Sequence, residues 1–233
     1  MADLSLCLPF APPAQGGGGF GFLRMFEAWL TKEGIPWSRK FHHRHRAVFV
    51  NSWSTSSLLL RLAMLRHPTM AVVHRVDGWP PLYGRMDGIE KKLVKVNRLA
   101  DLTIYQSQWA RRVMIGHLQD GPVIYNPVDT EVFCPRVREE SRGPTIYQAS
   151  VASVSWSDNP MKGGAAIRRI AEKNPDIYIR LIGRWPDMGE SDNICLQGII
   201  ALRGQLAVLL RYADALLTMS QHEACPNHVL EAL

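Results

Sequence analysis

Two glutamates near the end of the chain, Glu223 and Glu231, are spaced so that one precedes an expected helix and the other lies inside it. The surrounding segment, 220–233, reads Ser-Gln-His-Glu-Ala-Cys-Pro-Asn-His-Val-Leu-Glu-Ala-Leu. A loop carboxylate can accept hydrogen bonds from sugar hydroxyls, and a carboxylate one turn into the helix can hold a ribose. The N–H groups between them can face a diphosphate. A capping residue and a surface residue would show the same spacing, so the pattern alone leaves both interpretations open.

A lysine, Lys162, precedes two glycines in the segment Asn-Pro-Met-Lys-Gly-Gly at 159–164, where a helix is expected to begin. An ammonium group beside a helix N-terminus can stabilise the negative charge that grows on a departing diphosphate. In this role the lysine and the helix replace a metal ion. A solvated lysine in front of a helix is the alternative.

The glycine run 16–19 follows an expected strand and precedes an expected helix. At such a position backbone N–H groups can approach a phosphate, because glycine has no side chain to hold it away. Gly17, Gly18 and Gly19 are therefore candidates for a phosphate contact. The run lacks the G-x-G-x-x-G spacing with a downstream acid, so a flexible turn is equally compatible with it.

Polar residues also follow a third expected strand, in the segment Ala-Val-Val-His-Arg-Val-Asp-Gly at 71–78. His74, Arg75 and Asp77 lie near the carboxyl end of this strand, where open α/β sheets place their ligand groups. The alternative is a hydrogen-bonded histidine and an aspartate that caps the turn before Gly78.

Short β-rich runs alternate with helical patterns along the whole chain, which predicts parallel βαβ units and an α/β fold. Strands are expected at 4–10, 47–51, 70–74, 102–106, 123–125, 145–149, 177–182, 194–196 and 215–219. Helices are expected at 22–33, 55–66, 89–100, 109–116, 164–174, 205–213 and from His228 onward. The stretch 133–143 is irregular and predicts a linker at 135–143 between domains 1–134 and 144–233.

The composition describes a folded protein without an obvious nucleic-acid module. Hydrophobic residues make up 46% and charged residues 21% of the chain, unlike a disordered sequence. The formal net charge is +6, and a basic cluster at 39–46 faces either solvent or a phosphate or lipid surface. No aromatic ladder, zinc spacing or repeated basic helix accompanies it, so nucleic acid is not an expected partner.

The cysteines and the N-terminus predict a cytoplasmic protein. No C-x-x-C pair occurs among Cys7, Cys134, Cys195 and Cys225, so neither a disulfide framework nor a zinc site is expected. The first residues contain Asp3 and several prolines instead of a signal peptide, and no apolar run reaches about 18 residues. Contact with the inner face of a membrane would be peripheral, and the helix at 22–33 offers only a modest apolar face for it.

Taken in their order along the chain, these motifs resemble those of the retaining glycosyltransferases of family 4. They are the glycine loop, His-Arg-Val-Asp-Gly at 74–78, Asn-Pro-Val-Asp-Thr-Glu-Val-Phe at 126–133, Asn-Pro-Met-Lys-Gly-Gly, and the segment with the two glutamates. The resemblance spans nearly the whole chain, and the pair of glutamates is its most specific part.

The resemblance implies the GT-B fold, with two Rossmann-like parallel-sheet domains facing a cleft. The C-terminal domain would bind a nucleotide sugar, and the N-terminal domain a hydroxyl acceptor such as a glycan or lipid-linked sugar. The implied reaction is retaining transfer of a hexose, in surface polysaccharide or glycolipid assembly, with no metal or other cofactor. The leaving phosphate itself would accept the acceptor proton.

Site residues follow from the same resemblance. His74 would face the reacting sugar and Glu223 would contact it, which makes these two the catalytic candidates. Lys162 would bind the diphosphate, Glu231 the ribose, and the glycine loop the distal phosphate. The remaining donor-binding candidates lie between the two glutamates: Cys225, Pro226, Asn227 and His228.

Two departures from the family pattern support other hypotheses. Many family members carry an arginine several residues before the lysine, but 149–157 contains none, and Arg184 is only an uncertain substitute. The family also continues beyond Glu-Ala-Leu, so we expect an incomplete second domain, poor activity and marginal stability. These departures favour an inactive sugar-nucleotide-binding module or decayed paralogue as the alternative, and a sugar-nucleotide epimerase is a third hypothesis.

Overall fold

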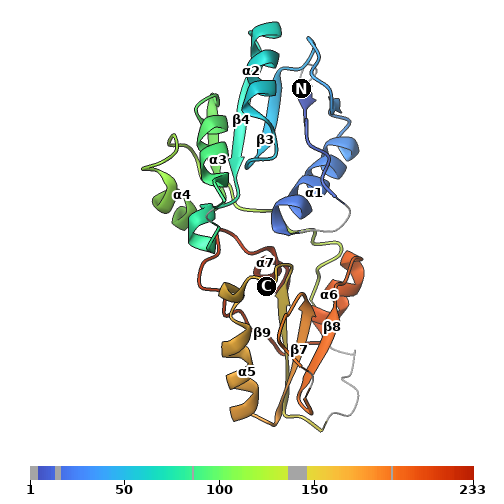
Figure 1. Cartoon of the computed structure of the whole chain (residues 1–233). Coiled ribbons are helices and arrows are strands. Elements are labelled where there is room, and N and C mark those ends of the chain that lie inside the picture. Colours follow the sequence, from blue (N-terminus) through green and yellow to red (C-terminus); the bar gives the residue numbers. More distant parts are fainter. Residues whose placement is uncertain (1–4, 14–16, 86, 136–145, 190) are drawn as a thin grey trace. The chain divides into compact units, whose positions relative to one another are not determined.

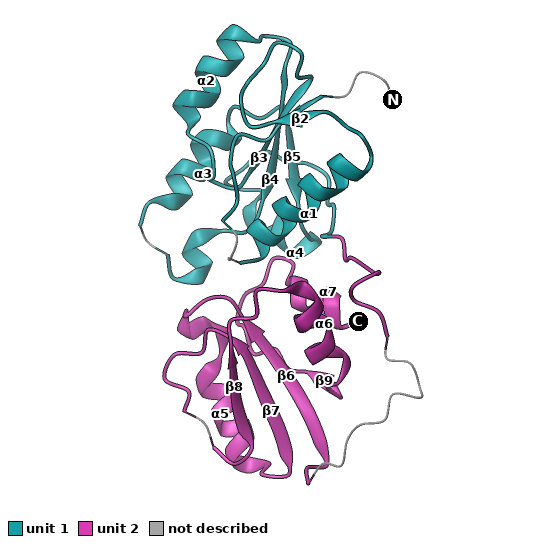
Figure 2. Ribbon diagram, turned by 90° about the vertical axis from the view of Figure 1, so that its right-hand side faces the viewer, with its two compact units in different colours: residues 1–126 teal, residues 127–233 magenta. Residues whose placement is uncertain are grey.

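The computed structural model describes residues 5–13, 17–85, 87–135, 146–189 and 191–233. The chain divides into two compact units, Met1–Asn126 and Pro127–Leu233 (Figure 1, and teal and magenta in Figure 2). Each unit contains one parallel β-sheet with helices packed on it, so the α/β class is confirmed.

Unit 1 contains a five-stranded sheet with the order β2-β1-β3-β4-β5, in which all neighbouring strands are parallel. Its strands are β1 Leu6–Cys7, β2 Trp37–Ser38, β3 Ala47–Asn51, β4 Ala71–Val76 and β5 Leu102–Tyr105. Its helices are α1 Gly18–Lys32, α2 Ser57–Arg66, α3 Ile89–Asn97 and α4 Gln108–Met114, and η1 Pro80–Tyr83 is a short 3₁₀ helix.

Side-chain alternation along β3 explains how helices cover both faces of this sheet. Val48 and Val50 are fully buried in one cluster together with Leu60 of α2 and Val96 of α3. The intervening Phe49 packs on the other face, in the cluster that contains Leu30 of α1. Successive strand residues point to opposite faces, so this apolar strand is covered on both sides.

Unit 2 contains a four-stranded parallel sheet with the order β8-β7-β6-β9. Its strands are β6 Ala149–Ser155, β7 Ile177–Gly183, β8 Ile194–Gly198 and β9 Ala215–Leu216. Its helices are α5 Gly164–Lys173, α6 Arg203–Arg211 and α7 Asn227–Ala232, with a 3₁₀ turn, η2, at Pro160–Lys162. Ile179 and Leu181 of β7 pack with α5, and Ile182 packs with α6 on the opposite face.

The division between the units falls at Asn126, within the expected N-terminal domain 1–134. The reason is packing, because Val128, Val132 and Phe133 join the cluster that contains Leu206 of α6. Apart from Pro135, the expected linker 135–143 lies outside the described residues.

Several expected elements differ from those observed: the strands expected at 4–10 and 215–219 are shorter, Leu6–Cys7 and Ala215–Leu216, and three other elements differ as follows. The strand expected at 145–149 is wrong: residues 146–148 are bends and the strand is Ala149–Ser155. The strand contains several serines, of which Ser153 is buried and donates its hydroxyl to the carbonyl of Leu217 over 2.8 Å. The helix expected from Phe22 begins at Gly18, and the strand expected at 123–125 is a single bridge between Tyr105 and Val123.

Candidate functional site

The strand order of unit 2 predicts where this unit binds a ligand. From β6 the chain moves outward to β7 and β8, then returns to place β9 on the other side of β6. In open α/β sheets the ligand crevice lies at such a switch point, at the carboxyl ends of the two strands. Here those ends lead into the segment 156–163 after β6 and the segment 217–226 after β9.

These two segments are in close backbone contact. The N–H of Gln221 donates to the carbonyl of Met161 over 3.0 Å. A Cβ atom on Gly163 would lie 2.4 Å from the carbonyl oxygen of Met219, and Gly163 has a φ of +85°. Glycine is therefore needed here both for the conformation and for the approach.

This approach brings together two residues that the sequence singled out. The Nζ of Lys162 forms an ion pair with Oε1 of Glu223, although the residues are far apart in the chain. The side chains are 23% and 22% exposed, so water and ligands can reach both. Because this pair is partly exposed, water weakens its attraction, and this lowers the free-energy cost of exchanging either partner for a ligand.

The position of Lys162 is fixed by the start of α5. The Asn159 side chain accepts a hydrogen bond from the N–H of Met161 over 2.9 Å, and this closes the η2 turn. Gly163 then caps α5 without a side chain, and the first turn of α5 carries no acidic residue. The first N–H groups of a helix lack intrahelical partners and carry partial positive charge. Lys162 and the start of α5 therefore suit an anion.

The segment 225–228 connects Glu223 to α7. Cys225 and Pro226 lie in the loop, Pro226 precedes the helix, and Asn227 and His228 begin it. Burial lowers the pKa of His228; Lys162 acts in the same direction and Glu223 opposes it. His228 is therefore a neutral ring that lies close enough to the Lys162–Glu223 pair to sense both charges.

Glu231 belongs to a second ion pair within unit 2. Its Oε1 lies 3.1 Å from Nη2 of Arg203, and the glutamate side chain is only 5% exposed. Burial raises the pKa of Glu231, and Arg203 partly offsets this effect. The guanidinium of Arg203 also lies over the ring of Phe133, 4.8 Å from its centroid.

The sequence did not single out Arg203, because the helix was expected from Gln205 and Arg203 would have preceded it. One feature of the sequence could have identified it. A helix that connects two parallel strands begins at the carboxyl edge of the sheet, where ligands bind, so a charged residue at the start of α6, between β8 and β9, is a candidate. Arg184, the candidate for the missing arginine, follows β7 at that edge and is exposed.

In unit 1 the switch point lies between β1 and β3, and the glycine run follows β1. Gly17 precedes α1, while Gly18 and Gly19 are its first residues. A Cβ atom on Gly19 would lie 2.2 Å from Oδ2 of Asp77, whereas one on Gly17 would meet nothing within 4 Å. Gly19 therefore allows the Asp77 carboxylate to approach the start of α1.

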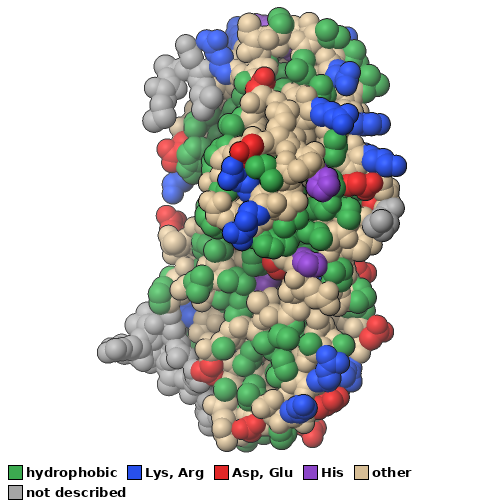
Figure 3. All heavy atoms as spheres, turned by 90° about the vertical axis from the view of Figure 1, so that its left-hand side faces the viewer, with side chains coloured by type: hydrophobic (Ala, Val, Ile, Leu, Met, Phe, Trp, Pro, Cys, Tyr) green, Lys and Arg blue, Asp and Glu red, His purple; other side chains and the backbone are tan. Residues whose placement is uncertain are grey.

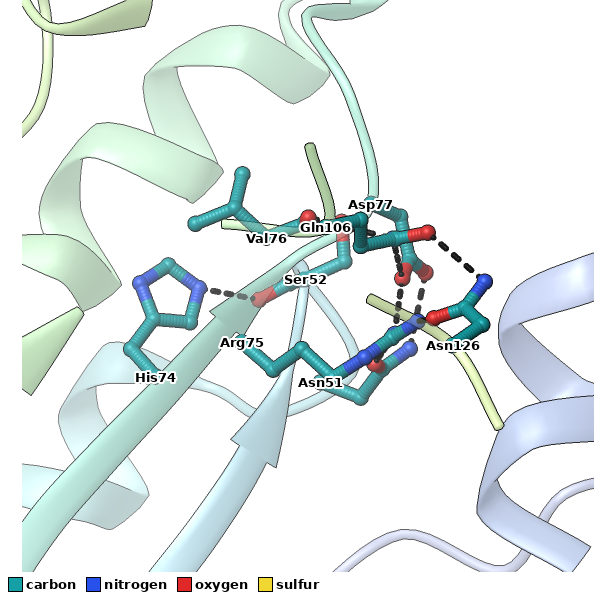
Figure 4. A network of polar contacts seen from close by, with 8 residues as sticks. All are labelled: Asn51, Ser52, His74, Arg75, Val76, Asp77, Gln106 and Asn126. Carbon is teal, nitrogen blue, oxygen red and sulfur yellow. Dashed lines mark hydrogen bonds and ion pairs between the residues drawn. The ribbon is translucent and has the colours of Figure 1, made fainter. Parts of the chain in front are cut away.

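Asp77 neutralises a buried arginine in a dense polar network (Figure 4). Arg75 is 2% exposed and donates to the side chains of Asn51, Asp77 and Asn126. Asp77 also accepts from Asn51 over 2.8 Å and from Gln106 over 2.7 Å. The guanidinium lies 3.7 Å from the ring centroid of Phe22 on α1. Arg75 and Asp77 thus satisfy each other instead of pointing toward solvent, and a broken pair of this kind is strongly destabilising.

His74 lies on the opposite face of β4 from Arg75, as alternation along a strand requires (Figure 4). The ring is 0% exposed, with Nε2 2.9 Å from the carbonyl of Ser52 and Nδ1 3.0 Å from the side-chain nitrogen of Asn97. Because the amide donates to Nδ1, Nε2 carries the proton and donates to Ser52. Burial lowers the pKa of His74 to about 4. The expected contact between this neutral ring and a sugar would require the ring to leave its position.

No group of three or more His, Cys, Asp or Glu side chains is arranged to hold a metal ion in the part of the chain that the structure describes. The groups assembled in unit 2 are instead an ammonium ion, two carboxylates and helix N-termini.

No protein-family model matches the chain, and no curated protein sequence matches it. Several solved structures are similar to this chain. The structure of HepE from Anabaena, in complex with UDP and glucose, is similar to this chain at a TM-score of 0.69 and 16% sequence identity. The similarity covers 98% of this chain and 77% of HepE. Sucrose-phosphate synthase from Thermosynechococcus elongatus matches 91% of this chain with 57% of its own, at a TM-score of 0.64 and 16% identity.

The lipopolysaccharide outer core galactosyltransferase WaaB matches 92% of this chain with 58% of its own, at a TM-score of 0.52 and 14% identity. This chain therefore spans little more than half the length of two of these three proteins. At such identities the likeness concerns the fold. The chain has the GT-B fold, and among these neighbours WaaB is a galactosyltransferase and HepE binds UDP and glucose.

Proposed function

We propose that this chain is a retaining glycosyltransferase of family 4, which transfers a hexose from a nucleoside-diphosphate sugar to a hydroxyl acceptor. The observation that carries the proposal is the partly exposed Lys162–Glu223 pair at the β6/β9 switch point. Unit 2 would bind the donor and unit 1 the acceptor, a glycan or lipid-linked sugar, in the assembly of a surface polysaccharide or glycolipid.

Donor binding would proceed by exchange of ion-pair partners. The diphosphate takes Lys162 and the N–H groups at the start of α5, and this releases Glu223 to accept hydrogen bonds from the sugar hydroxyls. The buried Glu231 accepts from the ribose hydroxyls, while Arg203 pairs with its carboxylate. Cys225, Pro226, Asn227 and His228 line the same loop and helix start.

The same residues would assist departure of the leaving group. As the glycosidic bond breaks, negative charge grows on the diphosphate, and an ammonium ion and a helix N-terminus held in place stabilise it. The leaving oxygen can accept the proton of the attacking hydroxyl on the same face of the sugar, so no enzymic base is needed. His74 would influence this step as a positioning residue, through the Ser52 loop that it holds.

None of the four cysteines, all of which the structure describes, forms a disulfide, which suits a reducing compartment, and we propose that the protein is cytoplasmic. The alternative function is a sugar-nucleotide-binding module without turnover. It is motivated by Arg75 and Asp77, which satisfy each other inside unit 1, and by the buried His74.

Calorimetric binding to the full chain tests the donor site. UDP, GDP and ADP are compared with their monophosphates for the wild type, Lys162→Ala and Glu231→Gln. Lys173→Ala, at the far end of α5, is the matched control. A lost charge-assisted hydrogen bond should weaken diphosphate binding by about 10- to 100-fold in Lys162→Ala, with little effect on monophosphates. Glu231→Gln should weaken both nucleotide classes alike.

A folded chain that binds none of these nucleotides, or an unchanged diphosphate preference in Lys162→Ala, would contradict the donor site. Turnover separates the remaining hypotheses. Transfer or hydrolysis of the donor with retained anomeric configuration supports the transferase, tight binding without turnover supports the binding module, and a C2-inverted sugar supports an epimerase.

A further inference from the structure

Helix α2 exposes an apolar face. Leu60 and Ala63 face the core of unit 1. The other side of this ten-residue helix carries leucines with large exposed fractions: Leu58 65%, Leu59 47%, Leu62 42% and Leu65 80%. Positions 58, 62 and 65 form one stripe along the helix, with position 59 beside it. Single exposed leucines are ordinary, but a contiguous stripe marks an interaction surface.

The surroundings of this stripe are basic. Residues 34–76 contain no Asp or Glu but hold Arg39, Lys40, Arg44, Arg46, Arg61, Arg66 and Arg75. Arg39 pairs with Glu27 and Arg75 with Asp77, while the other five are exposed. The formal charge of this segment is therefore +7, against a net charge of +6 for the whole chain.

The basic loop and the helix lie together. Phe41 packs against the cluster that contains Leu60 and Ala63. His42 and His45 of this loop lie close to His67, just after α2. Arg61 and Arg66 of α2 are exposed on the helix itself.

Helix α3 extends the basic surface, since it packs beside α2 and exposes Lys91, Lys92 and Lys95, and Arg98 is exposed directly after the helix. Its acid, Glu90, is half-buried. Figure 3 views the side on which α3 and α4 lie in Figure 1, and it shows Lys and Arg side chains interspersed with hydrophobic ones on unit 1.

We propose that α2, with the loop 39–46 and α3, docks unit 1 onto an anionic lipid bilayer. The leucine stripe enters the boundary between headgroups and acyl chains, and the surrounding Lys and Arg side chains contact the anionic headgroups. The docking is peripheral, as no helix in the described ranges is long and apolar enough to cross a membrane. This inference does not rest on the proposed transferase activity.

The positive charge around α2 favours an anionic membrane over a second copy of the chain as the partner of this surface. In a symmetric dimer through α2 the same basic patch would face itself, and like charges brought together are unfavourable. An anionic surface instead neutralises the patch while covering the leucines. Apolar and cationic side chains on one face are the combination that interfacial helices use.

Co-sedimentation with vesicles tests the proposal. The full chain is mixed with vesicles of phosphatidylcholine alone or of phosphatidylcholine and phosphatidylglycerol in equal amounts. The variants are Leu58→Ser/Leu65→Ser and Arg61→Gln/Arg66→Gln. Ile124→Ser, 55% exposed elsewhere in unit 1, and Lys173→Gln in unit 2 are the matched controls. All these side chains are exposed, so thermal melts should be unchanged.

We expect the wild type and the controls to bind the anionic vesicles, and both double variants to bind about tenfold or more weakly. Binding should fall when salt shortens the Debye length to about 3 Å. Equal binding to neutral vesicles, wild-type binding by the leucine variant, or a leucine-dependent dimer by light scattering without vesicle binding would each overturn the proposal.

Discussion

Gly163→Ala tests the close approach on which the candidate donor site depends. At a φ of +85° an alanine is in the left-handed region, which costs roughly 1–2 kcal/mol. Its Cβ would also lie 2.4 Å from the backbone oxygen of Met219, and overpacking against an atom that cannot rotate away costs about 1–3 kcal/mol more. We therefore expect unit 2 to lose about 2–5 kcal/mol of stability.

Urea unfolding measures this loss, and hydrogen exchange locates it in β6 and α5. Gly189→Ala, in the same unit but with nothing within 4 Å of its added Cβ, should change stability by less than about 0.5 kcal/mol. If the loop after β6 moves away to relieve the collision, Lys162 moves with it and nucleotide affinity falls as well. A Gly163→Ala protein with the stability and nucleotide affinity of the wild type would refute the packing of the two loops.

Two further predictions concern unit 1. Gly19→Ala should lower the free energy of unfolding by about 2–3 kcal/mol, because its Cβ would collide with the Asp77 carboxylate, which several donors hold in place. Gly17→Ala should lower it by at most about 1 kcal/mol. Equal losses of stability in urea unfolding would contradict the packing of Asp77 on α1. His74 has a folded-state pKa of about 4, below its unfolded value near 6.5, so its contribution is present above pH 6.5 and about 3 kcal/mol is lost as the pH falls to 4. The His74→Gln protein should lack this part of the pH dependence, and parallel curves would show that His74 is not buried in its neutral form.

The alternation of strand and helix patterns was sufficient to predict the fold class and most elements. β3 was predicted residue for residue, because a run of apolar β-branched and aromatic side chains ends at the polar Asn51. β6 was misplaced because its apolar residues alternate with serines. That a serine is buried can be inferred only when its hydrogen-bond partner is known. For Ser153 that partner, Leu217, lies on the chain segment that follows β9.

Contacts between individual site residues could not be predicted from the sequence, because they depend on which strands are neighbours in the sheet. The sequence placed Lys162 and Glu223 in segments that follow strands, but their contact requires β6 and β9 to be neighbours. The same limit explains the two surprises in unit 1. Whether Asp77 points toward a ligand or toward Arg75, and whether His74 is exposed, depends on side chains of α1, α3 and β3 that are remote in sequence.

The charged residues at the two switch points differ in one property that bears on ligand binding. In unit 1 Asp77 is 23% exposed, but the Arg75 side chain is only 3% exposed, and its network joins Asn51, Asp77 and Asn126. A ligand could enter only by breaking several buried bonds at once, each costly to leave unmade. In unit 2 both members of the Lys162–Glu223 pair are more than one-fifth exposed. An anion can replace one carboxylate there without leaving a buried charge alone, so of these two pairs Lys162–Glu223 is the more readily exchanged.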